Sequence, residues 1–150
     1  MIAPINACGV DVACVGNHEF DFGLDDIENL FRKCNFPWLC SNIFNVKTQA
    51  ILANNHAYYI EERSGIKMGI IGLAEGDWLH AITEIDMSIV RYEDFIDSGR
   101  TLAELLKREH DCDLIIALTH MRVPNDRKLA AAVPEIDLIL GGHDHIVHLE

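Results

Sequence analysis

Three apolar runs in this chain each end in a polar segment that carries a histidine, and this recurrence constrains the fold most. VACV (12–15) is followed by GNHEFD, LIIAL (114–118) by THM, and IDLIL (136–140) by GGHDH. Short apolar runs bounded by turn signals are typical of buried strands. In α/β folds, ligands bind beyond the carboxyl ends of the strands. The sequence therefore predicts a ligand site at one edge of a sheet.

The segments between these runs predict helices alternating with strands. LDDIENLFRKC (24–34) carries apolar residues at helical spacing, and Asp25 with Glu28 resembles a capping box at its start. AYYIEER (57–63) and IKMGIIGLA (66–74) flank Ser64-Gly65 and read as a β-hairpin. LIIALTHM (114–121) is expected to be buried on both faces. Further elements are expected at 2–8 (a helix ended by Gly9), 38–42 (a strand), 93–110 (a helix) and after Pro124 (a short helix).

Length, charge and cysteine content exclude several classes of protein. The 150 residues contain no repeats or linker-like stretches, so residues 1–150 are predicted to form a single α/β domain. The net charge of −12, from 24 acidic and 12 basic residues, argues against a nucleic-acid polymer or an anionic membrane as partner. No run approaches the roughly 18 apolar residues of a membrane span. The five cysteines lack metal-site spacing and the first residues lack a leader pattern, which favours a reducing, cytoplasmic setting.

The strand-end residues form one candidate site. A lone histidine at a strand end is more often a capping or surface residue, but three such ends in one short chain are harder to dismiss. If the strands are parallel neighbours, five side chains converge: Asn17, His18, His120, His143 and His145. Gly141 and Gly142 would allow the sharp turn that brings the last two histidines together. The other four histidines lack this context and are predicted at the surface: His56, His80, His110 and His148.

GNHEFDFG, LTHM and GGHDH strongly resemble the signature segments of the calcineurin-like dinuclear metallophosphoesterases, within their 5′-nucleotidase-like branch. The resemblance extends over essentially the whole chain, including SGIKMGIIGLAE (64–75) and DLIIALTHMRVPND (113–126). It implies a β-sandwich flanked by helices in αββα layers with a mixed sheet. This chain would be an incomplete domain that lacks the first strands of that fold.

The resemblance also implies roles for individual residues. Asn17, His120 and His143 match ligands of one metal ion, and His145 matches a ligand of the other. His18 matches the catalytic histidine that contacts the phosphate, and Asp21 matches the carboxylate that orients it. Imidazole and amide oxygen suit Mn, Zn or Fe, and Mg or Ca are further candidates. Two residues inside the motifs, Glu19 and Asp144, are predicted to shape the loops. Arg122 could meet a substrate anion, although a surface arginine is the simpler reading.

The family pattern begins with Asp-x-His and Gly-Asp motifs, and neither occurs before GNHE in this chain. The acids in those motifs include the carboxylate that bridges the two metal ions. Two divalent ions 4 Å apart repel by roughly 16 kcal/mol at an effective dielectric constant of 20. Neutral ligands do not offset that repulsion. The chain alone is therefore predicted to hold no working dinuclear centre, and at most one weakly bound ion.

Two functions from different classes remain open at this point. The first is a metal-dependent hydrolase of small phosphomonoesters, such as a nucleotide or a sugar phosphate, of which this chain is a part and is impaired alone. The second is a non-enzymatic relic, or a partner-binding module, on the same scaffold. Sheet faces left uncovered would also favour self-association.

Overall fold

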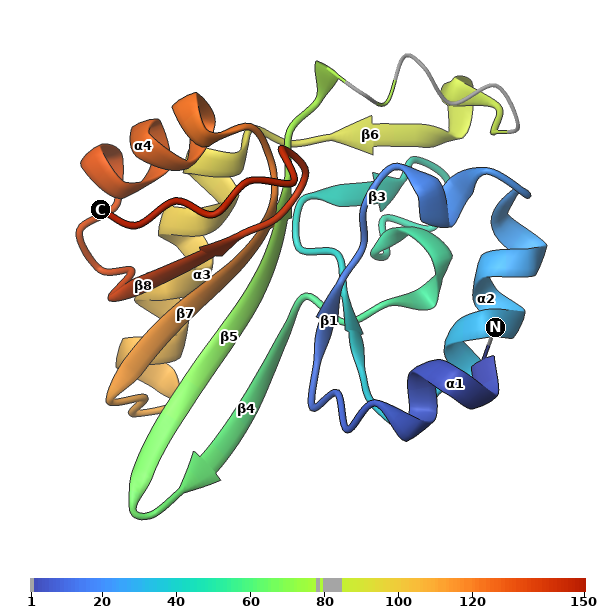
Figure 1. Ribbon diagram of the computed structural model, residues 1–150. Helices are drawn as coiled ribbons and strands as arrows, with labels where there is room; N and C mark the ends of the chain where they lie inside the picture. Colours follow the sequence, from blue (N-terminus) through green and yellow to red (C-terminus); the bar gives the residue numbers. More distant parts are fainter. Residues whose placement is uncertain (1, 78, 80–84) are drawn as a thin grey trace.

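The computed structural model describes residues 2–77, 79 and 85–150, and its strands lie between two groups of helices (Figure 1). The elements follow one another in the order α1 (Ile2–Ala7), β1 (Ala13–Cys14), α2 (Leu24–Lys33), β2 (Trp38–Leu39), β3 (Ile43–Asn45), β4 (Tyr58–Arg63), β5 (Ile66–Ala74), β6 (Val90–Tyr92), α3 (Phe95–Glu109), β7 (Leu114–His120), α4 (Val123–Ala132) and β8 (Leu138–Gly141). Short 3-10 turns occur at His18–Phe20, Leu52–Asn54 and Met87–Ile89. The predicted α/β class with a mixed sheet flanked by helices is confirmed.

The largest sheet has the strand order β4-β5-β7-β8. β4 and β5 form the predicted hairpin, and its two turn residues, Ser64 and Gly65, have φ of 53° and 80°. Positive φ at both central positions matches the twist of the flanking strands. β5, β7 and β8 run parallel, with Ala74 opposite His120 and Thr119 opposite Gly141. The carboxyl ends of these three strands therefore lie at one edge of the sheet.

Helices α3 and α4 pack on one face of this sheet (Figure 1). Buried apolar side chains of the helices, including Leu106 and Leu129, meet those of the strands, including Leu73 and Ile115. Along β7, fully buried residues alternate with half-buried ones. Both faces of β7 are thus covered, but the face toward the helices is covered more completely.

The N-terminal half builds its own apolar core from α2, β1, β2 and the loops between them. Phe20, Ile27, Trp38 and Leu52 are buried there. β1 pairs in parallel with β2, and β3 pairs with β6, in separate two-stranded sheets. The run at 12–15 therefore lies in a different sheet from the other two, so the condition that all three strands are parallel neighbours is not met. The hydrogen-bonding edges of β7 are already occupied by β5 and β8, which leaves no edge for β1.

Close backbone contacts join the two halves along β5. The backbone N–H of Ser41 donates to the carbonyl of Gly72 at 2.6 Å, and the Gly72 N–H donates to Ser41 Oγ at 2.7 Å. A Cβ on Gly72 would lie only 2.6 Å from Cβ of Leu39, so the absence of a side chain allows this approach. The amide of Asn42 exchanges two hydrogen bonds with the backbone of Ala74. These contacts place the N-terminal loops beside the carboxyl edge of the large sheet.

The start of α2 differs from its prediction. Gly23, with φ of 85°, is the N-cap, and no side-chain cap hydrogen bond forms there. The capping box of Asp25 and Glu28 was therefore wrong, because a glycine in a positive-φ conformation makes the turn. Asp25 and Asp26 still lie in the first turn, where negative charge is favourable to the helix dipole.

The remaining predictions about single residues are confirmed in part. His56 and His148 are exposed as predicted, whereas His110 is half-buried and its Nε2 lies 3.1 Å from the hydroxyl of Tyr58. His80 lies outside the described residues. All five cysteines are free thiols, with Cys40 and Cys112 buried.

Two further features of the surface bear on partners. β8 ends the large sheet, and Leu138 and Leu140 on it are exposed. Self-association through this edge stays a prediction. Among the described residues, none of the helices combines the length and apolar character needed to cross a membrane.

Candidate metal and phosphate site

Three strand ends meet at one place, although they come from two sheets. Asn17 follows β1, His120 ends β7, and His143 lies in the loop after β8. His120 Nε2 lies 2.7 Å from Asn17 Oδ1 and 3.0 Å from His143 Nδ1. The rings of His120 and His143 meet edge to face, with centroids 4.8 Å apart. Residues 103 positions apart in the chain are thus in direct contact.

The loop after β1 is shaped by small and acidic residues. A Cβ on Gly16 would lie 2.7 Å from two atoms of the His120 ring, so only glycine allows the ring to lie there without displacement. The Gly16 N–H donates to Glu19 Oε2 at 2.6 Å. Glu19 therefore stabilises the loop, as predicted, and it holds the backbone on which Asn17 is carried.

The loop after β8 turns at the histidines rather than at the glycines. His143 and His145 have φ of 45° and 53°. Gly141 is needed for a different reason: a Cβ there would lie 2.7 Å from Asp126 Oδ2. Asp144 accepts the backbone N–H of Val123 at 2.9 Å, which confirms its predicted role in shaping the loop. Gly141 and Gly142 do not have positive φ, whereas the two histidines do, so the prediction that the glycines make the turn was wrong.

Burial sets the charge state of His120. Desolvation, with smaller contributions from His143 and His18, lowers its pKa to about 4, although the carboxylate of Glu75 acts in the opposite direction. The ring is consequently neutral at pH 7. A neutral imidazole is the form that binds a metal ion.

The donor atoms of Asn17, His120 and His143 fit a divalent metal ion in kind and in direction. One amide oxygen and two imidazole nitrogens are ligands that Zn, Mn or Fe accept. The three side chains are already drawn together by hydrogen bonds. In the described part of the chain, no three His, Cys, Asp or Glu side chains are grouped to hold an ion. The candidate donors are thus two imidazole rings and one amide, with no carboxylate or thiolate among the three.

His18 and Asp21 lie beside this cluster, on the surface. His18 Nδ1 is 3.0 Å from Asp21 Oδ2, and the two side chains are 79% and 50% exposed. A carboxylate on one ring nitrogen fixes the tautomer and leaves the other nitrogen directed elsewhere. His145 is exposed, and it influences His120 electrostatically rather than by the contact seen for His143.

Arg122 is engaged with carboxylates. Its Nε lies 2.8 Å from Glu75 Oε1 and its Nη2 lies 3.2 Å from Asp77 Oδ2. The side chain is 46% exposed. A substrate anion would have to compete with these two acids for the guanidinium.

Glu75 is the residue that the sequence did not single out. It directly follows β5 and is only 1% exposed. The signal was present in the chain, since GLAEGD is a further apolar strand that ends in polar residues. Unlike the other strand ends, this one carries no histidine.

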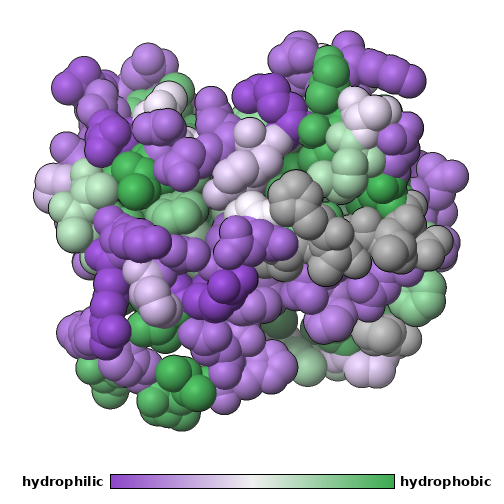
Figure 2. Space-filling view, turned by 90° about the horizontal axis from the view of Figure 1, so that it is seen from above, coloured by the Kyte–Doolittle hydropathy of each residue, from purple (hydrophilic) through white to green (hydrophobic). Residues whose placement is uncertain are grey.

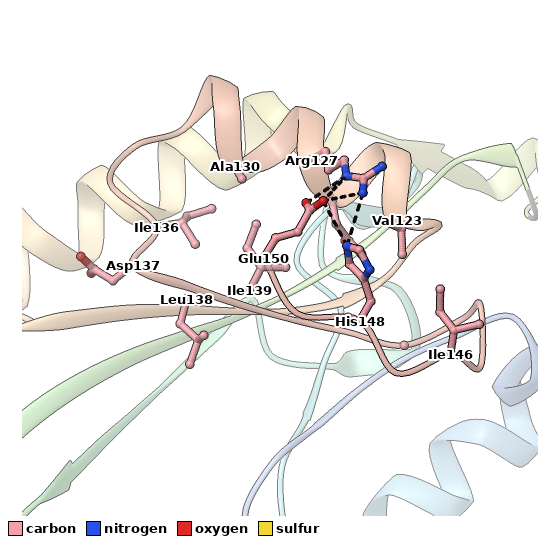
Figure 3. Close-up of a pocket in the computed structure, with 13 residues that line it drawn as sticks. Val123, Arg127, Ala130, Ile136, Asp137, Leu138, Ile139, Ile146, His148 and Glu150 are labelled. Carbon is pink, nitrogen blue, oxygen red and sulfur yellow. Dashed lines mark hydrogen bonds and ion pairs between the residues drawn. The ribbon is translucent and has the colours of Figure 1, made fainter.

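A cavity of about 320 Å³ lies elsewhere, between α4, β8 and the C-terminal segment (Figure 3). Arg127 pairs with Glu150 at its rim, and His148 lies within 3.2 Å of the same carboxylate. The walls include apolar side chains such as Ile136 and Ile139. The cavity shares the loop glycines Gly141 and Gly142 with the strand-end site but none of the three clustered donors, so it is a separate feature.

The face at the carboxyl edge of the sheet is largely polar. Seen from above, hydrophilic residues cover most of the surface, and the hydrophobic ones lie in separate patches (Figure 2). Such a surface suits a polar ligand better than a broad apolar contact.

Histidine and amide donors gathered at strand ends of a mixed α/β fold define a candidate metallohydrolase. The model of one family, described as calcineurin-like phosphoesterase, matches residues 2–147. The chain belongs to this family.

Known proteins agree with that assignment. A 5′-nucleotidase of Vibrio cholerae serotype O1 is 33% identical over 150 residues, covering 90% of this chain and 26% of the relative. The NAD nucleotidase (NadN) of Haemophilus influenzae superposes with a TM-score of 0.84 at 27% identity, over 99% of this chain and 29% of that one. The calcineurin-like phosphoesterase YfkN of Bacillus subtilis superposes with a TM-score of 0.83 at 25% identity, over 97% of this chain and 48% of that one. The chain spans about a quarter of the length of the curated relatives it matches.

Proposed function

We propose that this chain forms the part of a 5′-nucleotidase-type phosphomonoester hydrolase that binds one divalent metal ion and the phosphate. The observation that carries the proposal is the contact of His120 Nε2 with both Asn17 Oδ1 and His143 Nδ1. Relatives named 5′-nucleotidase support the substrate class, a small phosphomonoester such as a nucleotide. The five free thiols suit a reducing compartment, and a cytoplasmic location is part of the proposal.

Asn17, His120 and His143 would hold the ion, and His145 would approach it from the same loop as His143. The ion would supply positive charge for the phosphoryl oxygens and would lower the pKa of a bound water. His18, held through Nδ1 by Asp21, would present Nε2 to the phosphate and, as the imidazolium, would give its Nε2 proton to the leaving oxygen and become neutral. The exposure of His18 matches a group that must meet a substrate from solvent.

Titration calorimetry with Mn²⁺ and Zn²⁺ tests the metal part of this proposal. The wild-type chain should bind one ion, and His120→Ala should weaken binding at least about a hundredfold, since even indirect supporting groups cost 10–100-fold. His56→Ala removes an exposed histidine outside the cluster and should leave the affinity unchanged. Tight binding of two ions, or equal loss in both variants, would contradict it.

Hydrolysis tests the catalytic part. Manganese-dependent release of phosphate from p-nitrophenyl phosphate or a nucleoside monophosphate should fall to background in His18→Ala. Turnover by the wild type is proposed to be low, because this chain carries no Asp-x-His or Gly-Asp motif before GNHE. Metal binding without any turnover would instead favour the non-enzymatic alternative.

A further inference from the structure

The strongest unassigned feature is a buried carboxylate at the same edge of the sheet. Glu75 is 1% exposed and follows Ala74, the residue paired with His120 across β5 and β7. Burying an ionised carboxylate costs several kcal/mol unless charges and hydrogen bonds offset it. A well-packed apolar residue would serve stability as well or better. The presence of the acid therefore calls for a role other than packing.

Glu75 binds the turn that follows His120. Its Oε2 accepts the backbone N–H of Arg122 at 3.1 Å and the side-chain amide of Asn125 at 2.5 Å. Its Oε1 faces Arg122 Nε at 2.8 Å, at ion-pair distance but outside hydrogen-bond angles, and it accepts no hydrogen bond within the described ranges. Three groups of the segment 122–125 are thus directed at one carboxylate.

The opposite side of the turn is held in the same way. Asp144, after β8, accepts the backbone N–H of Val123 at 2.9 Å. α4 begins at Val123, and its N-cap, Arg122, makes no side-chain cap hydrogen bond. Glu75, after β5, and Asp144, after β8, therefore accept backbone N–H groups at the start of α4. The helix dipole also favours negative charge there. The backbone after His120 is thus held by hydrogen bonds to the segments that follow both neighbouring strands, β5 and β8.

We infer that Glu75 is a positioning residue, which holds the β7–α4 turn so that His120 meets Asn17 and His143 in a geometry ready for a metal ion. The inference rests on the proposed metal-binding function. Glu75 acts through the backbone N–H of Arg122 and the side chain of Asn125, in addition to its electrostatic effect on His120. Asp77 shares the Arg122 guanidinium with Glu75 but is 73% exposed, so it offers a matched comparison.

The test compares Glu75→Leu with Asp77→Leu in the whole chain. Each removes one carboxylate partner of Arg122, but only Glu75→Leu removes the acceptor of the turn. Glu75→Leu should raise the Kd for Mn²⁺ about tenfold, the lower end of the range for supporting residues. Asp77→Leu should change it less than twofold. Glu75→Gln keeps one acceptor oxygen and should recover part of the affinity.

A second readout separates this inference from the proposed function. In the metal-free protein, nuclear Overhauser contacts between the Asn17 side-chain amide and the His120 ring report their 2.7 Å approach directly. They should weaken in Glu75→Leu and persist in Asp77→Leu. If the wild type binds no Mn²⁺, the proposed function fails, and the ring contacts alone decide the inference. If Glu75→Leu does not fold, Asn125→Ala replaces it. Unchanged affinity and unchanged ring contacts in the variant would overturn the inference.

Discussion

The substitution Gly16→Ala tests whether the position of His120 depends on the loop after β1. The backbone of Gly16 is outside the positive-φ region, so alanine adds no conformational strain there. Its Cβ would lie 2.7 Å from Cε1 and Nδ1 and 2.9 Å from Cγ of His120. Ordinary contact begins near 3.4 Å, so the ring or the loop must move by about 0.7 Å.

The ring has little room for that movement. His120 Nε2 is within 2.7 Å of Asn17 Oδ1 and within 3.0 Å of His143 Nδ1, so a shift of this size breaks one of the two contacts. Overpacking of this kind costs about 1–3 kcal/mol. In a chain of 150 residues each kcal/mol lowers Tm by about 2–4 °C. Misplacing a ligand by about 0.7 Å should also weaken Mn²⁺ binding about tenfold.

Calorimetry measures both effects, by thermal unfolding and by Mn²⁺ titration. Gly142→Ala is the control, since its Cβ would meet Thr119 O at 3.5 Å and His120 Nδ1 at 3.9 Å, both ordinary contacts. Gly142→Ala should leave Tm and affinity close to those of the wild type. A Gly16→Ala protein with wild-type Tm and wild-type affinity would refute the steric reasoning.

Two more predictions concern groups outside the cluster. Burial raises the pKa of Cys40 to about 12, so iodoacetamide at pH 8 should modify exposed Cys8 in the folded chain and Cys40 only after unfolding; equal labelling by mass spectrometry would contradict this. Burial also raises the pKa of Asp126, despite the hydrogen bond from Thr119 that lowers it. The folded state therefore binds this proton more tightly than the unfolded state does, and the resulting stability is lost as pH rises through the folded pKa. Asp126→Asn should raise Tm at pH 7 and have less effect near pH 4; a lower Tm at pH 7 would contradict the assignment.

The convergence of Asn17, His120 and His143 was predictable because each follows an apolar run, and strand ends in such folds face a common site. Their contact distances were not predictable, because they depend on how closely two separate sheets approach. That approach depends on Gly16, which looks like any loop glycine in the sequence. Only the neighbouring ring shows why it must lack a side chain.

The errors have physical causes of the same kind. A strand of two residues, as at Ala13–Cys14, gives no local signal for its hydrogen-bonding partner, so tertiary packing decides it. The burial of Glu75 depends on Arg122, which lies 47 residues away. The turn at His143 uses a positive φ that local propensity assigns to the preceding glycines. Each case is a long-range contact overriding a local preference.

The most direct test of the account is anomalous diffraction at the manganese edge from crystals of the chain grown with Mn²⁺. One peak should lie among Asn17 Oδ1, His120 Nε2 and His143 Nδ1, with the three donors drawn slightly apart around it. A peak bound elsewhere, or none at a concentration that saturates the titration, would contradict the claim that these strand ends form a metal site.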